Sequence, residues 1–125
     1  ETEGDPAIKA RIRQIRLQRA RRRMLTTVPK ATVVITNPTH YAVALTYDRA
    51  TNAAPRVVAK GVDSMAARIR EVAEANKVPL MANPPLARAL YLVPLDAEIP
   101  ADHYQAVAEI IAYVWRLRQS VRAAP

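Results

Sequence analysis

Residues 31–47 read Ala-Thr-Val-Val-Ile-Thr-Asn-Pro-Thr-His-Tyr-Ala-Val-Ala-Leu-Thr-Tyr, the strongest structural signal in the chain. Two apolar runs, 31–35 and 41–47, flank a short polar segment. Apolar runs rich in valine and bounded by turn residues are typical of β-strands. An Asn-Pro pair favours a turn, because proline holds φ near the value that the second turn position requires. The sequence therefore predicts two strands joined by a tight bend at Asn37-Pro38.

The peptide bond between Asn37 and Pro38 has unusual chemistry. After most asparagines, the next backbone nitrogen attacks the side-chain carbonyl and the side-chain amide is lost. Pro38 has no N–H, so the reverse attack remains. The side-chain nitrogen of Asn37 attacks its own backbone carbonyl, closes a succinimide and expels the Pro38 nitrogen. His40 could transfer a proton at this bend, and Thr39 offers a hydroxyl. We predict a single self-cleavage, not multiple turnover, with these four residues as the catalytic set.

A second pair, Asn83-Pro84, is an internal control. No Thr-His follows it, and the pattern predicts the start of a helix, with Asn83 as the cap and Pro84 inside. A capping carboxamide points away from its own carbonyl. We therefore expect this second Asn-Pro bond to stay intact.

The rest of the chain alternates helical and strand-like patterns. We expect a helix over 6–24, strands over 56–60 and 79–82, the first of them closed by Gly61, and helices over 62–76, 84–92 and from Tyr104 onward. The nearly unbroken apolar character of 31–35 predicts a central strand covered on both faces. Together these elements predict an α/β fold, a small central sheet of about four strands wrapped by helices, with a basic N-terminal helical arm.

The formal charge of +8 is concentrated before residue 24. We expect residues 1–28 to form a basic helical linker arm and 29–125 to form the self-cleaving domain. A narrow apolar stripe fades after Leu17, so repulsion among the arginines that follow should fray the helix. The basic residues that we expect near a membrane are Arg11, Arg16, Arg19, Arg21, Arg22 and Arg23.

Three interpretations of this arm compete: a solvated helix, attraction to anionic lipid, and binding of nucleic acid. Nucleic acid is the least favoured, because no base-reading or stacking residues accompany the arginines. The alternative to self-cleavage is a non-enzymatic basic adaptor that binds nucleic acid or an anionic membrane. In that case Asn37-Pro38 would be an ordinary turn.

Several classes of site are poorly supported. The chain has no cysteine, and its two histidines, His40 and His103, are far apart in sequence, so we expect neither a metal nor a cofactor. We expect His103 to be exposed in the first turn of the last helix. Two glycines cannot form a Gly-rich phosphate loop. No stretch is long enough and apolar enough for a membrane span, and we expect no signal peptide.

Several further motifs occur in the order typical of one family. They are Gly4-Asp5-Pro6, Val58-Ala59-Lys60-Gly61, Arg68-Ile69-Arg70-Glu71, Pro85-Leu86-Ala87-Arg88-Ala89-Leu90-Tyr91 and Ala106-Val107-Ala108-Glu109. Together with Asn-Pro-Thr-His between two strands, they resemble the FlhB/YscU family of export-switch proteins in type III secretion systems. The resemblance extends to about Leu117. Pro84-Pro85 and Val114-Trp115 look more like the flagellar branch than the injectisome branch.

This resemblance implies that the chain is the cytoplasmic tail of a longer polytopic membrane protein, at the inner membrane of a bacterium. It implies cleavage between Asn37 and Pro38 and a switch in export substrates from rod and hook components to filament components. The implied partners are export substrates, the hook-length control protein, other export-gate components and the membrane surface. We expect the two cleavage fragments to stay associated, because strand pairing and core burial survive the cut.

A partner-binding surface is also expected. Ala54 and Pro55 form an apolar loop tip, and Ala108 and Ile111 lie on the wide apolar face of the last helix. Apolar groups in a loop can mark a partner site, so substrate peptides could dock here. Core packing is the competing interpretation for Ile111.

Overall fold

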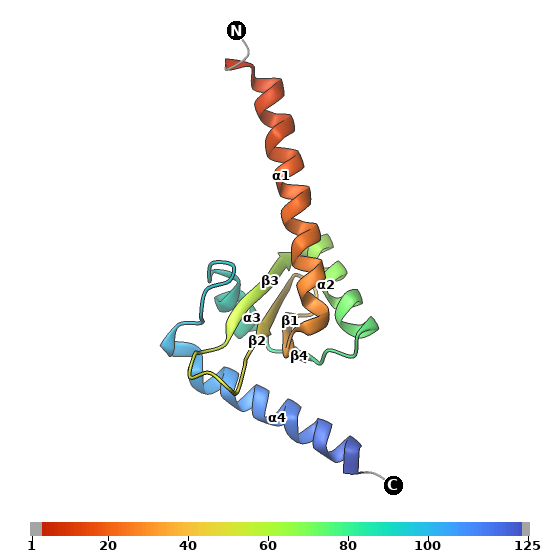
Figure 1. Cartoon of the computed structure of the whole chain (residues 1–125), viewed down its shortest axis with the longest axis vertical. Helices are drawn as coiled ribbons and strands as arrows, with labels where there is room; N and C mark the ends of the chain where they lie inside the picture. The colour runs from red at the N-terminus through yellow and green to blue at the C-terminus, as the bar shows by residue number, and fades with distance from the viewer. Residues whose placement is uncertain (1–3, 124–125) are drawn as a thin grey trace.

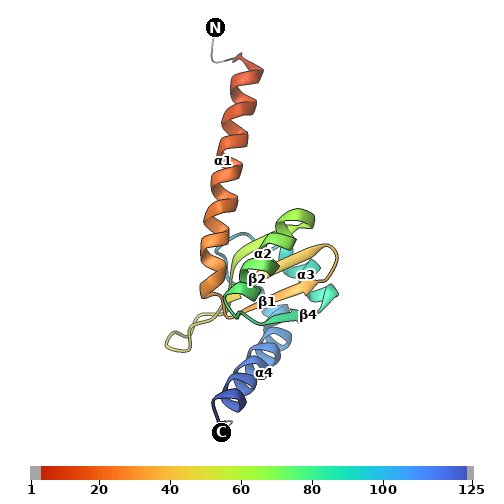
Figure 2. The same cartoon turned by 90° about the vertical axis from the view of Figure 1, so that its right-hand side faces the viewer.

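The computed structural model describes residues 4–123, with side chains to Ser120. In chain order the elements are α1 (Pro6–Thr27), η2 (Val28–Lys30), β1 (Val33–Asn37), β2 (Tyr41–Thr46), β3 (Arg56–Val62), α2 (Asp63–Ala75), β4 (Leu80–Ala82), α3 (Pro84–Tyr91), η3 (Ala101–His103) and α4 (Tyr104–Ala123). The predicted α/β fold is confirmed. The N-terminal part of α1 projects from the body that holds the sheet, and its last turns lie beside that body (Figure 1). A second view shows α1 projecting from one end of the body and α4 lying at the other (Figure 2).

The four strands form one mixed sheet in the order β3-β2-β1-β4. β1 pairs antiparallel with β2 and parallel with β4, so it has a neighbour on each side. Its residues Val33, Val34 and Ile35 are fully buried. The prediction of a central strand covered on both faces is therefore confirmed, and the hairpin tip stands at one end of the sheet.

Alternate side chains of the strands enter two separate cores, as the two-residue period of a strand requires. On one face, Val33, Ile35 and Leu45 pack against α3 and α4. On the other face, small side chains such as Ala42 and Ala44 let α2 pack closely, and the end of α1 joins this second core. The hairpin therefore contributes to both cores.

Helix α1 begins as predicted but ends later. The Asp5 carboxylate accepts a hydrogen bond from the Ala7 N–H (2.9 Å). The expected fraying is wrong, because the helix continues unbroken to Thr27. Met24 and Leu25 pack against the second core, and the Thr27 hydroxyl donates to the Val58 carbonyl (3.1 Å). Tertiary contacts at its last turns thus support a helix whose charges disfavour it.

Strand boundaries differ from the expectation by one or two residues: β2 ends at Thr46 and β4 begins at Leu80, and the differences in β1 and β3 bear on the site. β1 covers Val33–Asn37 instead of 31–35, so Asn37 belongs to the sheet and pairs with Tyr41. β3 does not stop at Gly61 but continues to Val62. A side chain at Gly61 would collide with Met65, since a Cβ there would lie 2.5 Å from Met65 Cγ. This glycine therefore permits close packing of strand and helix and does not end the strand.

Candidate functional site

The tip of the β1–β2 hairpin is a four-residue turn from Asn37 to His40. The backbone N–H of His40 donates to the Asn37 carbonyl oxygen at 3.0 Å, with Pro38 at the second turn position. Asn37 and Tyr41 pair across the base of the turn. The carbonyl that would be attacked during cleavage is therefore already hydrogen-bonded to a main-chain donor.

This turn is open to solvent on its outer side. Pro38, Thr39 and His40 are exposed, whereas Asn37 is half-buried and the preceding Thr36 is buried. The structure thus brings the four predicted residues together in one turn. Strand pairing holds the backbone of Asn37, and Pro38 on the other side of the predicted cleavage site is exposed.

The imidazole of His40 has a partner from a different part of the chain. Its Nδ1 lies 3.4 Å from Oδ1 of Asp63, the first residue of α2. The Asp63 N–H also donates to the His40 carbonyl at 2.9 Å. The backbone N–H of His40, rather than its ring, is what contacts the Asn37 carbonyl.

The second Asn-Pro pair directly follows the neighbouring strand. β4 pairs with β1 as far as Thr36 and Ala82, and the Asn83 N–H donates to the Thr36 carbonyl at 2.9 Å. The Asn83 side-chain oxygen accepts from the Leu86 N–H at 3.3 Å, with Pro84 as the first residue of α3. The predicted helix cap is confirmed, and the carboxamide is held toward the helix.

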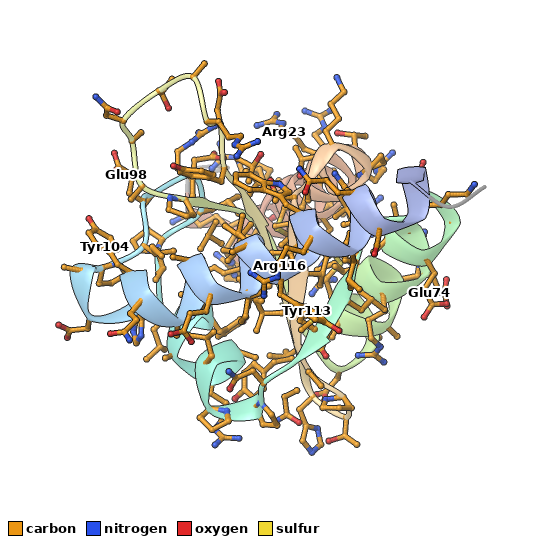
Figure 3. All side chains as sticks on the ribbon, turned by 90° about the horizontal axis from the view of Figure 1, so that it is seen from below. Arg23, Glu74, Glu98, Tyr104, Tyr113 and Arg116 are labelled. Carbon is orange, nitrogen blue, oxygen red and sulfur yellow. The ribbon has the colours of Figure 1, made fainter. Side chains whose placement is uncertain are left out.

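The four residues of the expected partner surface line one cavity of about 430 Å³ between the 48–55 loop and α4. Ala54 and Pro55 are half-buried and Ala108 is exposed, whereas Ile111 is only 3% exposed and packs in the core. Aromatic walls come from Tyr47, Tyr104 and Trp115. Figure 3 shows Tyr104 at the beginning of α4 and Glu98 beside the loop.

The basic arm projects into solvent. α1 has no buried residue, and the arginines expected near a membrane are all exposed. Arg21 and Arg22 also line a groove shared with Met65 and Arg68 of α2. Within residues 4–123, no helix combines the length and the apolar character needed to cross a bilayer.

His103 differs from its expected place. It is half-buried in the 3₁₀ turn that precedes α4, not exposed in the helix itself. Proline at position 100 starts this tighter turn, and His103 N–H bonds to its carbonyl at 3.0 Å. Among the residues that the structure describes, no three histidine or acidic side chains gather as a metal-ligand group.

Sequence reasoning missed Asp63 and the aromatic walls of the cavity. No spacing rule connects Asp63 with His40, because they lie 23 residues apart on different elements. The helical spacing of Tyr104, Ala108 and Trp115 was a signal for one shared face of α4. Tyr47 at the end of β2 could be assigned to the same cavity only after the strands were paired.

Comparison with known proteins identifies the family. The model of the FlhB HrpN YscU SpaS family matches residues 1–114. The flagellar biosynthetic protein FlhB of Escherichia coli K12 is 52% identical over 120 residues, covering 95% of this chain and 31% of that protein. FlhB of Bacillus subtilis 168 is 50% identical over 122 residues, covering 97% of this chain and 34% of that protein.

Solved structures agree with this similarity. The cytoplasmic domain of FlhB from Shewanella putrefaciens superposes with a TM-score of 0.77 at 48% identity, over 82% of this chain and 79% of that one. An EscU C-terminal domain with one asparagine changed to alanine superposes with a TM-score of 0.70 at 32% identity, over 73% of this chain and 92% of that one. The chain therefore belongs to the FlhB HrpN YscU SpaS family, and it spans about a third of the length of the curated relatives it matches.

Proposed function

We propose that this chain is the self-cleaving cytoplasmic domain of a flagellar type III export protein, and that it cuts its own backbone between Asn37 and Pro38. The observation that supports this proposal most directly is the hydrogen bond from the His40 N–H to the Asn37 carbonyl inside an exposed proline turn. Among the solved relatives, EscU variants carry substitutions at an asparagine or at the proline that follows it.

The chemistry needs no cofactor. The Asn37 side-chain nitrogen forms a bond to the Asn37 carbonyl carbon and loses a proton. The bond to the Pro38 nitrogen breaks, and that nitrogen takes up a proton and leaves as a secondary amine. The new carboxyl-terminal succinimide is later opened by water. Negative charge gathers on the carbonyl oxygen during attack, and the His40 N–H is placed to stabilise it.

The required acceleration is moderate. A bond that lasts years has a barrier near ~28 kcal/mol, and one that lasts minutes has a barrier near ~21 kcal/mol. The fold must therefore supply about 7 kcal/mol, which lies within the range available from a preorganised attack geometry. Strand pairing fixes the backbone of Asn37, and the oxyanion contact adds to this positioning.

The two fragments should remain one folded particle. Residues 1–37 include Val28, Val33, Val34 and Ile35, all fully buried in cores that residues 38–125 complete. Each such side chain contributes roughly 1.5–3 kcal/mol through burial. β1 also keeps both of its neighbours in the sheet. Cleavage would free the Pro38–His40 segment without releasing the strand, and this change of surface is the proposed switch from rod and hook to filament substrates.

The cavity between the 48–55 loop and α4 is the proposed docking place for export partners, which include the export substrates and the hook-length control protein. Its small side chains, Ala54 and Ala108, leave room for an apolar group between aromatic walls. Ala108→Glu should weaken peptide binding without unfolding the domain, because Ala108 is exposed. Unchanged binding by a folded Ala108→Glu variant would remove this part of the proposal.

The basic arm is the proposed contact with the cytoplasmic surface of the inner membrane. Its exposed arginines can approach anionic lipid, at roughly 1 kcal/mol per residue. Flotation of the protein with anionic vesicles at two salt concentrations tests this contact, and gel shift with duplex DNA tests the nucleic-acid alternative. Salt-sensitive flotation supports the lipid contact, whereas a gel shift without flotation favours the alternative.

Mass spectrometry of the purified protein under denaturing conditions tests self-cleavage. We expect two masses, for residues 1–37 and 38–125, whose sum equals the intact mass before ring opening and exceeds it by one water afterwards. Under native conditions the two fragments should elute as one particle. Asn37→Ala should give one intact chain. A wild-type protein that stays whole for days at neutral pH, or an Asn37→Ala protein that still divides, would contradict the mechanism.

A further inference from the structure

Asp63 touches the hairpin tip through two different groups. Its backbone N–H donates to the His40 carbonyl at 2.9 Å, and its carboxylate oxygen Oδ1 lies 3.4 Å from His40 Nδ1. These contacts join the start of α2 to the turn that carries the reacting bond. They involve both the main chain and the ring of one residue of that turn.

The backbone of Asp63 adopts a conformation that its residue type seldom takes. Its φ is 49°, in the left-handed region that side chains disfavour and that aspartate tolerates better than most. Such conformations persist where the surrounding structure imposes them, and they concentrate at functional sites. The positive φ of Asp63 therefore needs an explanation from the residues around it.

The cause lies in the junction between β3 and α2, which has no loop. Val62 still pairs with Tyr41, and the helix begins at the next residue. Met65 packs so closely against Gly61 that a side chain at position 61 would collide with it. Asp63 must therefore turn the chain within one residue, and that turn aims its N–H and its carboxylate at His40.

We propose that Asp63 is a positioning residue for the self-cleavage at Asn37-Pro38, acting through His40; this inference rests on the proposed function. A carboxylate can only accept a hydrogen bond, so it selects the tautomer of neutral His40 that carries its proton on Nδ1. Nε2 is then the ring atom left to accept a proton. The Asp63 N–H holds the His40 main chain in the turn, where the His40 N–H meets the Asn37 carbonyl.

An ordinary surface ion pair is the competing explanation. The His40 and Asp63 side chains are 64% and 76% exposed, and exposed pairs contribute little to folding stability. The two explanations differ in what they predict. A surface pair affects neither stability nor cleavage, whereas a positioning residue changes cleavage and leaves stability alone.

The experiment follows cleavage of newly translated, radiolabelled protein on denaturing gels over time. Asp63→Asn removes the charge, keeps the backbone N–H, and suits the left-handed conformation. We expect it to cleave about ten times more slowly than wild type, less than the roughly 10²–10⁴-fold contribution of a proton-transfer group itself, because Asp63 acts through His40. Asp96→Asn is the matched control, because Asp96 is exposed and has a φ of 67°, and it should cleave within twofold of wild type.

Two further variants separate the charge from the backbone. Asp63→Gly adopts a positive φ freely and lacks the carboxylate, so it should slow cleavage as much as Asp63→Asn. Adding Asp63→Asn to His40→Ala should slow cleavage no further, since the carboxylate then has no ring to orient. Thermal unfolding of each variant in the uncut Asn37→Ala background should give the same midpoint.

The tautomer provides a readout that a structural role would not change. In the Asn37→Ala protein, ¹⁵N shifts of the His40 ring should show the proton mainly on Nδ1, and Asp63→Asn should shift the population toward Nε2. Asp63→Asn and Asp63→Gly proteins that cleave at the wild-type rate would overturn the positioning role and leave self-cleavage standing. The role also fails if Asp63→Asn slows the His40→Ala protein by the same factor as wild type. If wild type itself does not cleave, the proposed function fails and the positioning role fails with it.

Discussion

The two Asn-Pro pairs of this chain lie side by side at the same end of the sheet, yet the structure gives them opposite surroundings. Asn37 ends the central strand, and its carbonyl accepts the His40 N–H inside an exposed turn. Asn83 follows the neighbouring strand, and its side chain caps α3 through the Leu86 N–H. The same dipeptide is therefore the proposed cleavage site in one place and a helix start in the other.

What differs is the use of the carboxamide. The Asn83 side chain has a stabilising partner in the helix, so rotation toward its own carbonyl would cost a hydrogen bond. Its carbonyl accepts from the Ala87 N–H at 2.9 Å, as the Asn37 carbonyl accepts from the His40 N–H at 3.0 Å, so the two pairs differ in the side chain and not in the carbonyl. The proposed difference in reactivity between the two Asn-Pro bonds therefore lies in what the asparagine side chain already binds.

The largest expected effect is the loss of cleavage in Asn37→Ala beside its retention in Asn83→Ala. Removing the nucleophile removes the unassisted cyclisation together with the contribution of about 7 kcal/mol from the fold, so the rate should be at least about 10⁵ times lower. Asn83→Ala should cleave within about twofold of wild type, because its side chain takes no part in the reaction. Time courses on denaturing gels measure both rates, and a comparable loss in Asn83→Ala would mean that the two pairs act together.

The next largest effect concerns how tightly the two fragments stay associated after the proposed cleavage. Ile35→Ala should weaken the association of the two fragments by about 2–5 kcal/mol, because Ile35 is fully buried two residues before the cut. Ile12→Ala on the exposed part of α1 is the matched control and should change association little. Urea titration of the cleaved protein, followed by native chromatography, measures the difference. Equal stability of these two variants would show that β1 does not hold the fragments together.

A smaller effect is expected at the other end of the helix that Asn83 starts. The Lys60 ammonium donates to the Tyr91 carbonyl at 2.9 Å and to the Val93 carbonyl at 2.7 Å, at the end of α3. Lys60→Met should lower the free energy of unfolding by about 2 kcal/mol, as expected for hydrogen bonds to a charged group. Lys30→Met changes an exposed lysine and should cost much less. Chemical denaturation in the Asn37→Ala background checks this result.

The smallest expected effect is the loss of the Asn83 cap itself. In the Asn37→Ala background, adding Asn83→Ala should lower the free energy of unfolding by about 1 kcal/mol. Asp5→Ala removes a cap of the same kind from α1, but that end of α1 lies outside the body, so global unfolding should hardly change. Urea unfolding of the three proteins measures both costs. If Asn83→Ala left the free energy of unfolding unchanged, the cap would not explain why the Asn83 carboxamide stays bound to the helix.

Much of the fold followed from local patterns. Strand-like runs, helical periods and the Asn83 cap depend on neighbours a few residues apart, and the structure confirms them. Boundaries were less accurate where tertiary contacts intervene. α1 continues through its arginine run because Met24 and Leu25 pack against the second core. Gly61 lies within β3, and its lack of a side chain leaves room for Met65.

The candidate site divides in the same way. The four residues of the turn are consecutive, so their order alone places them together. The cavity could not be predicted from local patterns, because it forms only where the 48–55 loop packs near α4. Its aromatic walls come from elements that are far apart in sequence. Asp63 lies near His40 because β3 pairs with β2 and α2 begins directly after β3, and this arrangement could not be predicted from local patterns.

The order of residues by itself determined the kinds of elements, the bend at Asn37-Pro38 and the chemistry open to that bond, since each depends on covalent structure and on contacts along the chain. Only the tertiary structure decided that β1 lies between β2 and β4 and that Asp63 lies within contact distance of His40. It also decided that the Asn83 side chain caps a helix, whereas the Asn37 side chain does not. The physical reason is that strand pairing and core packing join residues far apart in sequence. Their geometry follows from how the whole chain buries its apolar side chains.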